Sequence, residues 1–247
     1  MNIKVSIIIA TFNAAKTLPI ALKSVKDQSF QEWECIIIDG ASTDGTIDII
    51  KEFANNDSRF RYISEPDRGV YDAFNKGWKI AKGEWIQYLG DDDTLTINGI
   101  SELIKEEDEK TDVLNGHCYV KKIDGKEKPC FSKGIRGCHQ GKLMRRSVLE
   151  KFNGFDMKYK ILADLDLMLR LEDAGVAVKV VDTFVAYFSM EGMSQELSGF
   201  YTRIKERYDI YCRYSFAIIL KNVIVKSIYE IGSIIYRKIS RRIKQNK

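Results

Sequence analysis

The 247-residue sequence lacks several features that mark common protein classes. It contains no uninterrupted run of 18 or more apolar residues, so no segment has the pattern of a membrane-spanning helix. Its first ten residues lack the basic start, long apolar stretch and cleavage site of a signal peptide, and we expect a first strand there. No repeat or low-complexity tract interrupts the chain. The sequence therefore predicts one domain with an appendage, or two small lobes.

Cysteine pairs and standard phosphate-binding motifs are also absent. The five cysteines are odd in number and none lies in a Cys-x-x-Cys pair, which favours reduced thiols in the cytosol over a disulfide framework. His117, Cys118, Cys138 and His139 match no standard spacing of zinc ligands. Neither G-x-G-x-x-G after the first strand nor G-x-x-x-x-G-K-[ST] occurs, which argues against a dinucleotide-binding fold and a P-loop.

Positive charge is scarce outside the C-terminal end. Residues 221–247 hold eight Lys and Arg against one Glu, a charge of +7. Because the whole chain carries +4, residues 1–220 carry −3. A basic surface for nucleic acid is therefore not expected on the body of the protein.

Strand and helix patterns alternate through the first 95 residues. Short apolar runs predict strands, and amphipathic stretches between them predict helices. This order indicates an α/β protein with a mostly parallel sheet and right-handed crossovers, whose ligands bind at the carboxyl ends of the strands. The second half is less regular, with an expected hairpin over 113–123 and helices over 146–152 and 163–174. The expected strands are 5–10, 34–39, 61–64 and 85–89, and the loops that follow them are 11–15, 39–45, 65–69 and 90–94.

The segment WIQYLGDDD ends a predicted strand in three consecutive carboxylates, Asp91, Asp92 and Asp93. Crowded like charges repel, so a cation is expected among them. A hard divalent ion such as Mg²⁺ or Mn²⁺ takes oxygen ligands and often shares them with a substrate diphosphate. The alternative is a solvated acidic turn in which Asp93 or Thr94 caps a helix over 96–107.

Six motifs in order and spacing resemble the family 2 glycosyltransferases with a GT-A fold, especially bacterial enzymes of capsule, O-antigen or exopolysaccharide assembly. The resemblance covers about residues 3–190. It implies a Rossmann-like GT-A domain over 1–200, with a nucleotide-binding half (1–95) and an acceptor half (96–200), followed by a basic amphipathic helical tail (201–247). The motifs are VSIIIATFN, IIDGASTDGT, EPDRGVYDAFNKGWKIAKGEW, YLGDDD, GFD and ADLDLMLRL.

The resemblance also implies a donor site in the first half. Gly40 stands where the family carries a second acid, so UDP is only the default nucleotide. Some of the expected donor-site residues have another interpretation. Asp39 could cap a helix, and Asp67 with Arg68 could form a surface ion pair. For Asp72 and Asn75, on the following helix, the alternative is polar packing. The expected nucleotide-sugar-binding residues are Thr11, Asn13, Asp39, Asp67, Arg68, Asp72, Asn75 and Asp91.

The resemblance implies that the acidic run, Asp91 to Asp93, corresponds to the DXD motif of the family. Asp92 is the expected ligand of Mn²⁺ or Mg²⁺. Asp91 is expected to face the ribose or the metal. Asp93 is expected to be a further ligand, or to support the site or cap a helix.

ADLDLMLRL matches the family's ED motif, with Ala163 in place of the common glutamate. Asp164 is thus expected to be the catalytic base, with Asp166 as a weaker candidate and a helix N-cap as the alternative. His139 and Gln140 match an HQ pair near the acceptor or diphosphate, although a packed histidine is equally consistent.

The tail combines an apolar stripe with interleaved Lys and Arg. Packing of this stripe on the domain and contact with an anionic membrane are both consistent with the pattern. We expect peripheral attachment at the cytoplasmic face of a bacterial cell membrane. The stripe comprises Leu220, Ile224, Ile228, Ile231, Ile235 and Ile239.

Together these features predict a metal-dependent hexosyl- or N-acetylhexosaminyltransferase that acts with inversion. The expected donor is a UDP-sugar, and the expected acceptor is a polyprenyl-diphosphate-linked or growing polysaccharide. A sugar-1-phosphate nucleotidyltransferase would need a glycine-rich loop after the first strand, which is missing. A non-catalytic nucleotide-sugar- or membrane-binding scaffold would have no need of Asp92 and Asp164. Sugar, linkage and oligomeric state are not encoded in any motif that we can read.

Overall fold

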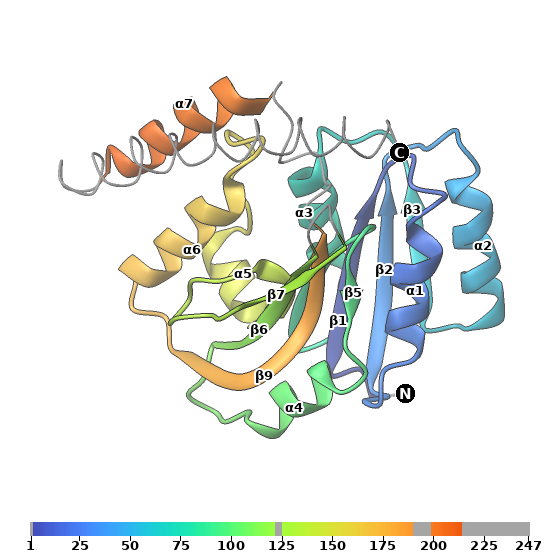
Figure 1. Cartoon of the computed structure of the whole chain (residues 1–247), viewed down its shortest axis with the longest axis horizontal. Coiled ribbons are helices and arrows are strands. Elements are labelled where there is room, and N and C mark those ends of the chain that lie inside the picture. The colour runs from blue at the N-terminus through green and yellow to red at the C-terminus, as the bar shows by residue number, and fades with distance from the viewer. Residues whose placement is uncertain (1, 122–124, 190–198, 214–247) are drawn as a thin grey trace.

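The computed structural model describes residues 2–121, 125–189 and 199–213 (Figure 1). Its strands are β1 (Val5–Thr11), β2 (Trp33–Asp39), β3 (Phe60–Ser64), β4 (Trp85–Gly90), β5 (Thr94–Leu95), β6 (Val113–Lys121), β7 (Glu127–Cys130), β8 (Lys142–Arg145) and β9 (Val178–Ser189). Its helices are α1 (Leu18–Lys26), α2 (Thr46–Asn56), α3 (Val70–Ile80), α4 (Gly99–Lys105), the short 3₁₀ helix η1 (His139–Gly141), α5 (Arg146–Phe152), α6 (Ala163–Asp173) and α7 (Phe200–Tyr211).

The strands form one mixed sheet. Its order within the described residues is β3-β2-β1-β4-β8-β6-β9-β5, with β7 paired to β6. The first four strands in this order are parallel, as the sequence predicts. β8 is antiparallel to both β4 and β6, whereas β6 and the long, curved β9 are parallel. The prediction of an α/β fold is confirmed; the sheet, expected to be mostly parallel, is parallel over β1 to β4 and mixed beyond them.

Alternation along the central strands divides the core into two layers. In β1, Ile7 and Ile9 pack with α1, α2 and α4, whereas Ile8 packs on the opposite face with α3, α5 and α6. All seven residues of β1 are buried, which is why the strand reads as a continuous β-branched run. Each fully buried isoleucine contributes about 1.5–3 kcal/mol. The central strands are therefore held firmly, and the loops at their ends are fixed in place.

Two predicted elements differ from the structure. The expected helix over 96–107 is shorter, because Thr94 and Leu95 pair with β9 and the helix begins only at Gly99. The expected hairpin also has a different second strand, because β6 continues to Lys121 and pairs with Glu127–Cys130. Both differences arise from strand pairing that local periodicity does not encode.

The chain continues to pack on the domain beyond residue 200. Ile210 and Tyr211 of α7 are buried in the same core layer as Leu167 of α6, and Figure 1 shows α7 above α6. The division at residues 95 and 200 stays a prediction, although the core extends past the second boundary. The tail's apolar stripe, 220–239, lies outside the described residues.

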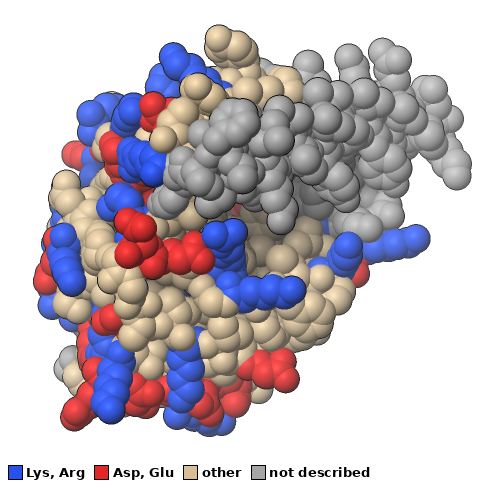
Figure 2. Space-filling view, turned by 90° about the vertical axis from the view of Figure 1, so that its left-hand side faces the viewer, with Lys and Arg blue, Asp and Glu red and all other residues tan. Residues whose placement is uncertain are grey.

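Charges of both signs are interspersed on the described surface. Figure 2 shows Lys and Arg among Asp and Glu over one face of the molecule. Of the helices in the described part, none is long and apolar enough to cross a membrane.

Candidate active site

A cavity of about 520 Å³ lies at the carboxyl ends of β1 and β4. Its walls also include the start of α3, the η1 turn, the start of α6, the end of β9 and one residue of α7. Eight of the predicted site residues line it: Thr11, Asp67, Asp91, Asp92, Asp93, His139, Gln140 and Asp164. Five do not: Asn13, Asp39, Arg68, Asp72 and Asn75.

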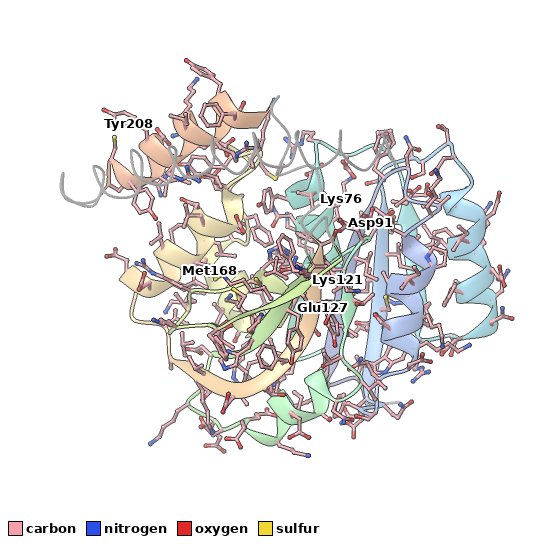
Figure 3. The ribbon with its side chains drawn as sticks, viewed as in Figure 1. Lys76, Asp91, Lys121, Glu127, Met168 and Tyr208 are labelled. Carbon is pink, nitrogen blue, oxygen red and sulfur yellow. The ribbon has the colours of Figure 1, made fainter. Side chains whose placement is uncertain are left out.

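The acidic run occupies the end of β4, where Figure 3 shows Asp91 near the centre of the molecule. Asp93 is only 2% exposed. One of its carboxylate oxygens accepts hydrogen bonds from the Gln140 amide (2.7 Å) and the Gly90 backbone N–H (3.2 Å), and the other accepts one from the Ser189 backbone N–H (2.8 Å). Asp93 is thus engaged with the protein and ties β4 to η1 and β9.

Burial makes these carboxylates reluctant to ionise together. Burial and the charges of Asp93 and Asp91 raise the pKa of the Asp92 carboxyl to about 7. Burial also raises the pKa values of Asp91 and Asp93. A cation close to the carboxylates would favour their ionised form and lower these pKa values. The run is therefore suited to bind positive charge.

Asp164 lies at the start of α6. The N-cap residue of this helix is Leu162, so the capping alternative for Asp164 does not hold. One oxygen of Asp164 accepts a hydrogen bond from the Leu165 backbone N–H (2.8 Å) and lies 3.0 Å from the Tyr71 hydroxyl, while the other lies 3.8 Å from His139 Nδ1. Burial alone would raise its pKa, but His139, Leu165 and Tyr71 outweigh burial and hold the pKa below its ordinary value. Asp164 is therefore ionised near neutral pH and can accept a proton.

The η1 turn joins the two acidic centres. Its consecutive residues His139 and Gln140 face Asp164 and Asp93, respectively. The turn is anchored by Gln87, whose amide donates to the Gln140 carbonyl (2.8 Å). The Lys142 ammonium donates hydrogen bonds to the carbonyls of residues 137 and 138, just before the turn (both 2.9 Å). The η1 turn thus connects the acidic run to the candidate base, Asp164.

The loop after β1 lines the cavity through Phe12, whereas the loop after β2, which was also expected to bind the nucleotide, does not line it. Gly40, where the family carries an acid, packs so closely that an added Cβ would lie 2.9 Å from a carboxylate oxygen of Asp67. A second acid at this position would crowd Asp67. Asp39 instead points into the protein, where its carboxylate accepts hydrogen bonds from Ser42 and Ser64.

Three more predicted residues take part in local contacts. Asn13, in the left-handed region with φ 51°, accepts a hydrogen bond from the Thr43 backbone N–H. Arg68 and Asp72 form an i,i+4 ion pair at the surface (3.0 Å), so the partner of Arg68 is Asp72 and not Asp67; such a pair is worth little stability. These contacts order the loops around the cavity.

Asn75 joins α3 to the turn after α5. Its side-chain oxygen accepts from the Phe155 backbone N–H and from Trp78 Nε1 (both 3.0 Å), and its amide donates to the Phe155 carbonyl (2.8 Å). Gly154 packs directly against this group. A larger residue would clash there, because an added Cβ would lie 2.5 Å from the Asn75 oxygen. Asn75 thus makes the contacts expected from the polar-packing alternative, and its donor-binding role stays a prediction.

We expect Asn75→Ala to lower the free energy of unfolding by about 2–3 kcal/mol, because three buried polar groups lose their partner. Denaturant unfolding measures this change, and the exposed Asn55→Ala is the matched control with an effect near zero. Nucleotide affinity should stay at the wild-type value. Weaker nucleotide binding at unchanged stability would restore the donor-binding role.

Tyr71 and Arg203 are among the cavity residues that sequence reasoning missed. Tyr71 lies between Arg68 and Asp72 in the recognised motif EPDRGVYDAFNKGWKIAKGEW, which is the signal that could have pointed to it. Arg203, 5% exposed, comes from α7 and carries no sequence signal. Among the described residues that line the cavity, Arg203 and His139 are the only side chains that can carry positive charge.

The mixed α/β sheet flanked by helices is the architecture of the GT-A fold. Residues 6–160 match the sequence profile of "Glycosyl transferase family 2". The chain is 34% identical to a PGL/p-HBAD biosynthesis glycosyltransferase of Mycobacterium bovis over 177 residues. The aligned region covers 67% of this chain and 68% of the relative. The chain belongs to glycosyl transferase family 2.

Other similar proteins extend the comparison. A GalNAc(5)-diNAcBac-PP-undecaprenol beta-1,3-glucosyltransferase of Campylobacter jejuni is 31% identical over 134 residues, 53% of this chain and 43% of that protein. S. aureus TarS in complex with UDP-GlcNAc superposes with a TM-score of 0.70 at 19% identity, covering 96% of this chain and 73% of that one. The mannosyltransferase PcManGT of Pyrobaculum calidifontis, solved with GDP-Man and Mn²⁺, has a TM-score of 0.68 at 14% identity, with coverage of 92% and 69%. At these identities the two structures establish the fold.

Proposed function

We propose that this glycosyltransferase moves one hexose or N-acetylhexosamine from a nucleotide-sugar, with UDP as the default carrier, to an acceptor hydroxyl with inversion. The observation that carries the proposal is one cavity whose lining includes Asp91, Asp92 and the ionised Asp164. A leaving diphosphate and an attacking hydroxyl need these two environments on opposite sides of the sugar. The η1 turn contacts Asp164 through His139 and the acidic run through Gln140 and Asp93, and would hold the base and the acidic run in register.

The donor side fits a cation that arrives with the diphosphate. In the described part of the chain, no group of three or more His, Cys, Asp and Glu side chains is arranged to hold a metal ion. Mg²⁺ commonly binds through one or two carboxylates plus substrate phosphates, and Asp92 with Asp91 supplies such oxygens. When bound, Mn²⁺ or Mg²⁺ would stabilise the charge of the leaving diphosphate. Asp93 was expected as a further ligand, but its three protein donors favour a role in holding the run.

Asp164 is the proposed catalytic base. It would take the proton of the acceptor hydroxyl as that oxygen attacks C1 of the sugar. Leu165 and Tyr71 orient the carboxylate, so that its second oxygen, on the His139 side, is the one that receives the proton. Attack from the face opposite the leaving group gives single displacement with inversion of configuration.

The similar proteins support a cell-surface glycan as the acceptor. The name of one relative includes PP-undecaprenol and the name of another includes PGL/p-HBAD biosynthesis, and a polyprenyl-diphosphate-linked glycan is our proposed acceptor class. The TarS complex with UDP-GlcNAc supports a UDP-sugar, and the PcManGT complex supports a divalent ion. We further propose peripheral attachment to the cytoplasmic face of the membrane through the basic tail.

The direct test offers the protein UDP-, GDP- and dTDP-sugars with Mn²⁺ and a polyprenyl-diphosphate disaccharide, and measures release of the nucleoside diphosphate. We expect release from one UDP-sugar, and product of inverted anomeric configuration by NMR. Release from none of the donors, with and without acceptor, would contradict the proposal. Retained configuration would contradict the single-displacement mechanism.

Arg203 is expected to contribute to donor binding. A guanidinium in a cavity lined by carboxylates can pair with a diphosphate, and a charge-assisted hydrogen bond is worth about 1.5–3 kcal/mol. Arg203→Ala should therefore weaken UDP binding by about 10- to 100-fold in calorimetry. Lys205→Ala, an exposed position on the same helix, is the matched control and should bind like the wild type. Equal UDP affinity in Arg203→Ala and Lys205→Ala would remove Arg203 from the donor site.

A further inference from the structure

Glu206 of α7 is a buried acid with an unusual set of partners. It is 7% exposed. One carboxylate oxygen accepts a hydrogen bond from the backbone N–H of Lys160 (2.7 Å). The other accepts from Ile161 (3.1 Å) and Leu162 (2.9 Å). A buried carboxylate is costly unless hydrogen-bonded, and three consecutive backbone donors satisfy it.

The segment that Glu206 holds, residues 160–162, leads directly into the helix of the proposed base. Leu162 is the N-cap residue of α6, and Asp164 follows two residues later. The Ile161 carbonyl lies 2.8 Å from the Tyr71 hydroxyl, which lies 3.0 Å from Asp164. Ile161 and Leu162 also line the cavity. The position of this segment thus sets both the backbone of Asp164 and the hydroxyl beside its carboxylate.

The rest of α7 has its own attachments to the domain. Asp209 accepts hydrogen bonds from the Tyr159 hydroxyl and the Lys158 ammonium (both 2.6 Å). Arg213, just past α7, pairs with the buried Asp166 of α6 at 3.0 Å, and Ile210 is buried in the core. α7 should therefore remain docked when Glu206 is changed. The contacts of Glu206 with the backbone of residues 160–162 are therefore separate from those that dock α7. This helix lies outside the residues matched by the family profile.

We propose that Glu206 is a positioning residue for Asp164: it fixes residues 160–162 so that Tyr71 and the carboxylate keep their productive geometry. The inference rests on the proposed role of Asp164 as the base. Glu206 does not line the cavity, so it acts through the backbone and not on the substrate. A small displacement of a reacting group can cost about 100-fold in rate. Loss of Glu206 should thus reduce kcat and leave nucleotide binding intact.

The test compares Glu206→Ala and Glu206→Gln in the full-length protein, with Asp209→Asn as the control that removes a different α7 contact. Hydrogen exchange of the amides of residues 160–162, UDP affinity by calorimetry, kcat and KM are measured. In Glu206→Ala we expect faster exchange of these amides, a kcat about 10- to 100-fold lower, and unchanged UDP affinity. Glu206→Gln, which keeps an acceptor oxygen, should recover part of kcat. Asp209→Asn should keep wild-type exchange at the three amides.

Three results would overturn the inference. If exchange at residues 160–162 is the same in Glu206→Ala as in the wild type, Glu206 does not hold the segment. If exchange rises but kcat stays at the wild-type value while Asp164→Asn is inactive, Glu206 has no positioning role, and the proposed function stands. If Asp164→Asn is as active as the wild type, the assigned base itself is wrong and the positioning role falls with it. The Asp164→Asn arm thus separates failure of the inference from failure of the proposed function.

Discussion

An Asp164→Asn variant is expected to lower kcat about 1,000-fold while its affinity for UDP stays within about twofold of wild type. Asparagine keeps the size of the side chain, and its oxygen can still accept from Leu165 and face Tyr71. It cannot take the acceptor's proton, and general-base catalysis contributes about 100- to 10,000-fold. Steady-state turnover with the best donor and calorimetry of UDP separate the two effects.

The control for this variant is Asp173→Asn, an exposed acid at the other end of α6. It should turn over like the wild type. Asp166, the weaker candidate, is 1% exposed and ion-paired with Arg170 (2.7 Å) and Arg213 (3.0 Å). Its carboxylate therefore stabilises α6 and α7. Turnover by Asp164→Asn at the wild-type rate would show that another group takes the proton.

The first four strands could be predicted because their apolar runs are nearly continuous. β1 and β4 each end within one residue of the predicted position. The rule that ligands bind at the carboxyl ends of parallel strands then brings Thr11 and the acidic run together, and both line the cavity. Buried strands are specified locally, by residue type, so a single sequence is enough to locate them.

The surroundings of Asn75 and Arg203 could not be predicted from the residues near them in the sequence. Asn75 lies within a recognised motif, but its partner Phe155 is 80 residues away in the sequence. Nothing near Asn75 tells whether its amide faces a ligand or another loop. Arg203 lies on a helix with no motif and reaches the cavity because that helix docks on the domain, with Ile210 and Tyr211 in the core. Both outcomes depend on tertiary packing, which acts between segments that are distant in the sequence.

Asp92→Ala is expected to abolish metal-dependent binding of UDP and to lower turnover about 100- to 1,000-fold. A bound divalent ion stabilises a leaving group by several kcal/mol, and each 1.4 kcal/mol is a factor of ten. Binding of UDP is measured by calorimetry with Mn²⁺ and with EDTA. The variant should match the wild type in EDTA and fall below it in Mn²⁺. Equal Mn²⁺-dependent binding by both proteins would place the ion elsewhere.

The raised pKa of Asp92 gives this site a predictable pH dependence. A carboxyl with a pKa of about 7 carries a proton below that pH, and the proton must leave before a cation can bind. The metal-dependent affinity for UDP should thus be full above pH 7 and fall by up to about tenfold per unit as the pH drops below 7. Asp164, whose pKa is lowered, stays ionised throughout this window and adds no limb of its own. An Asp92→Asn variant, which has no proton to lose at this position, should bind UDP with Mn²⁺ more weakly and without this slope. The same slope in Asp92→Asn would assign the titration to another group.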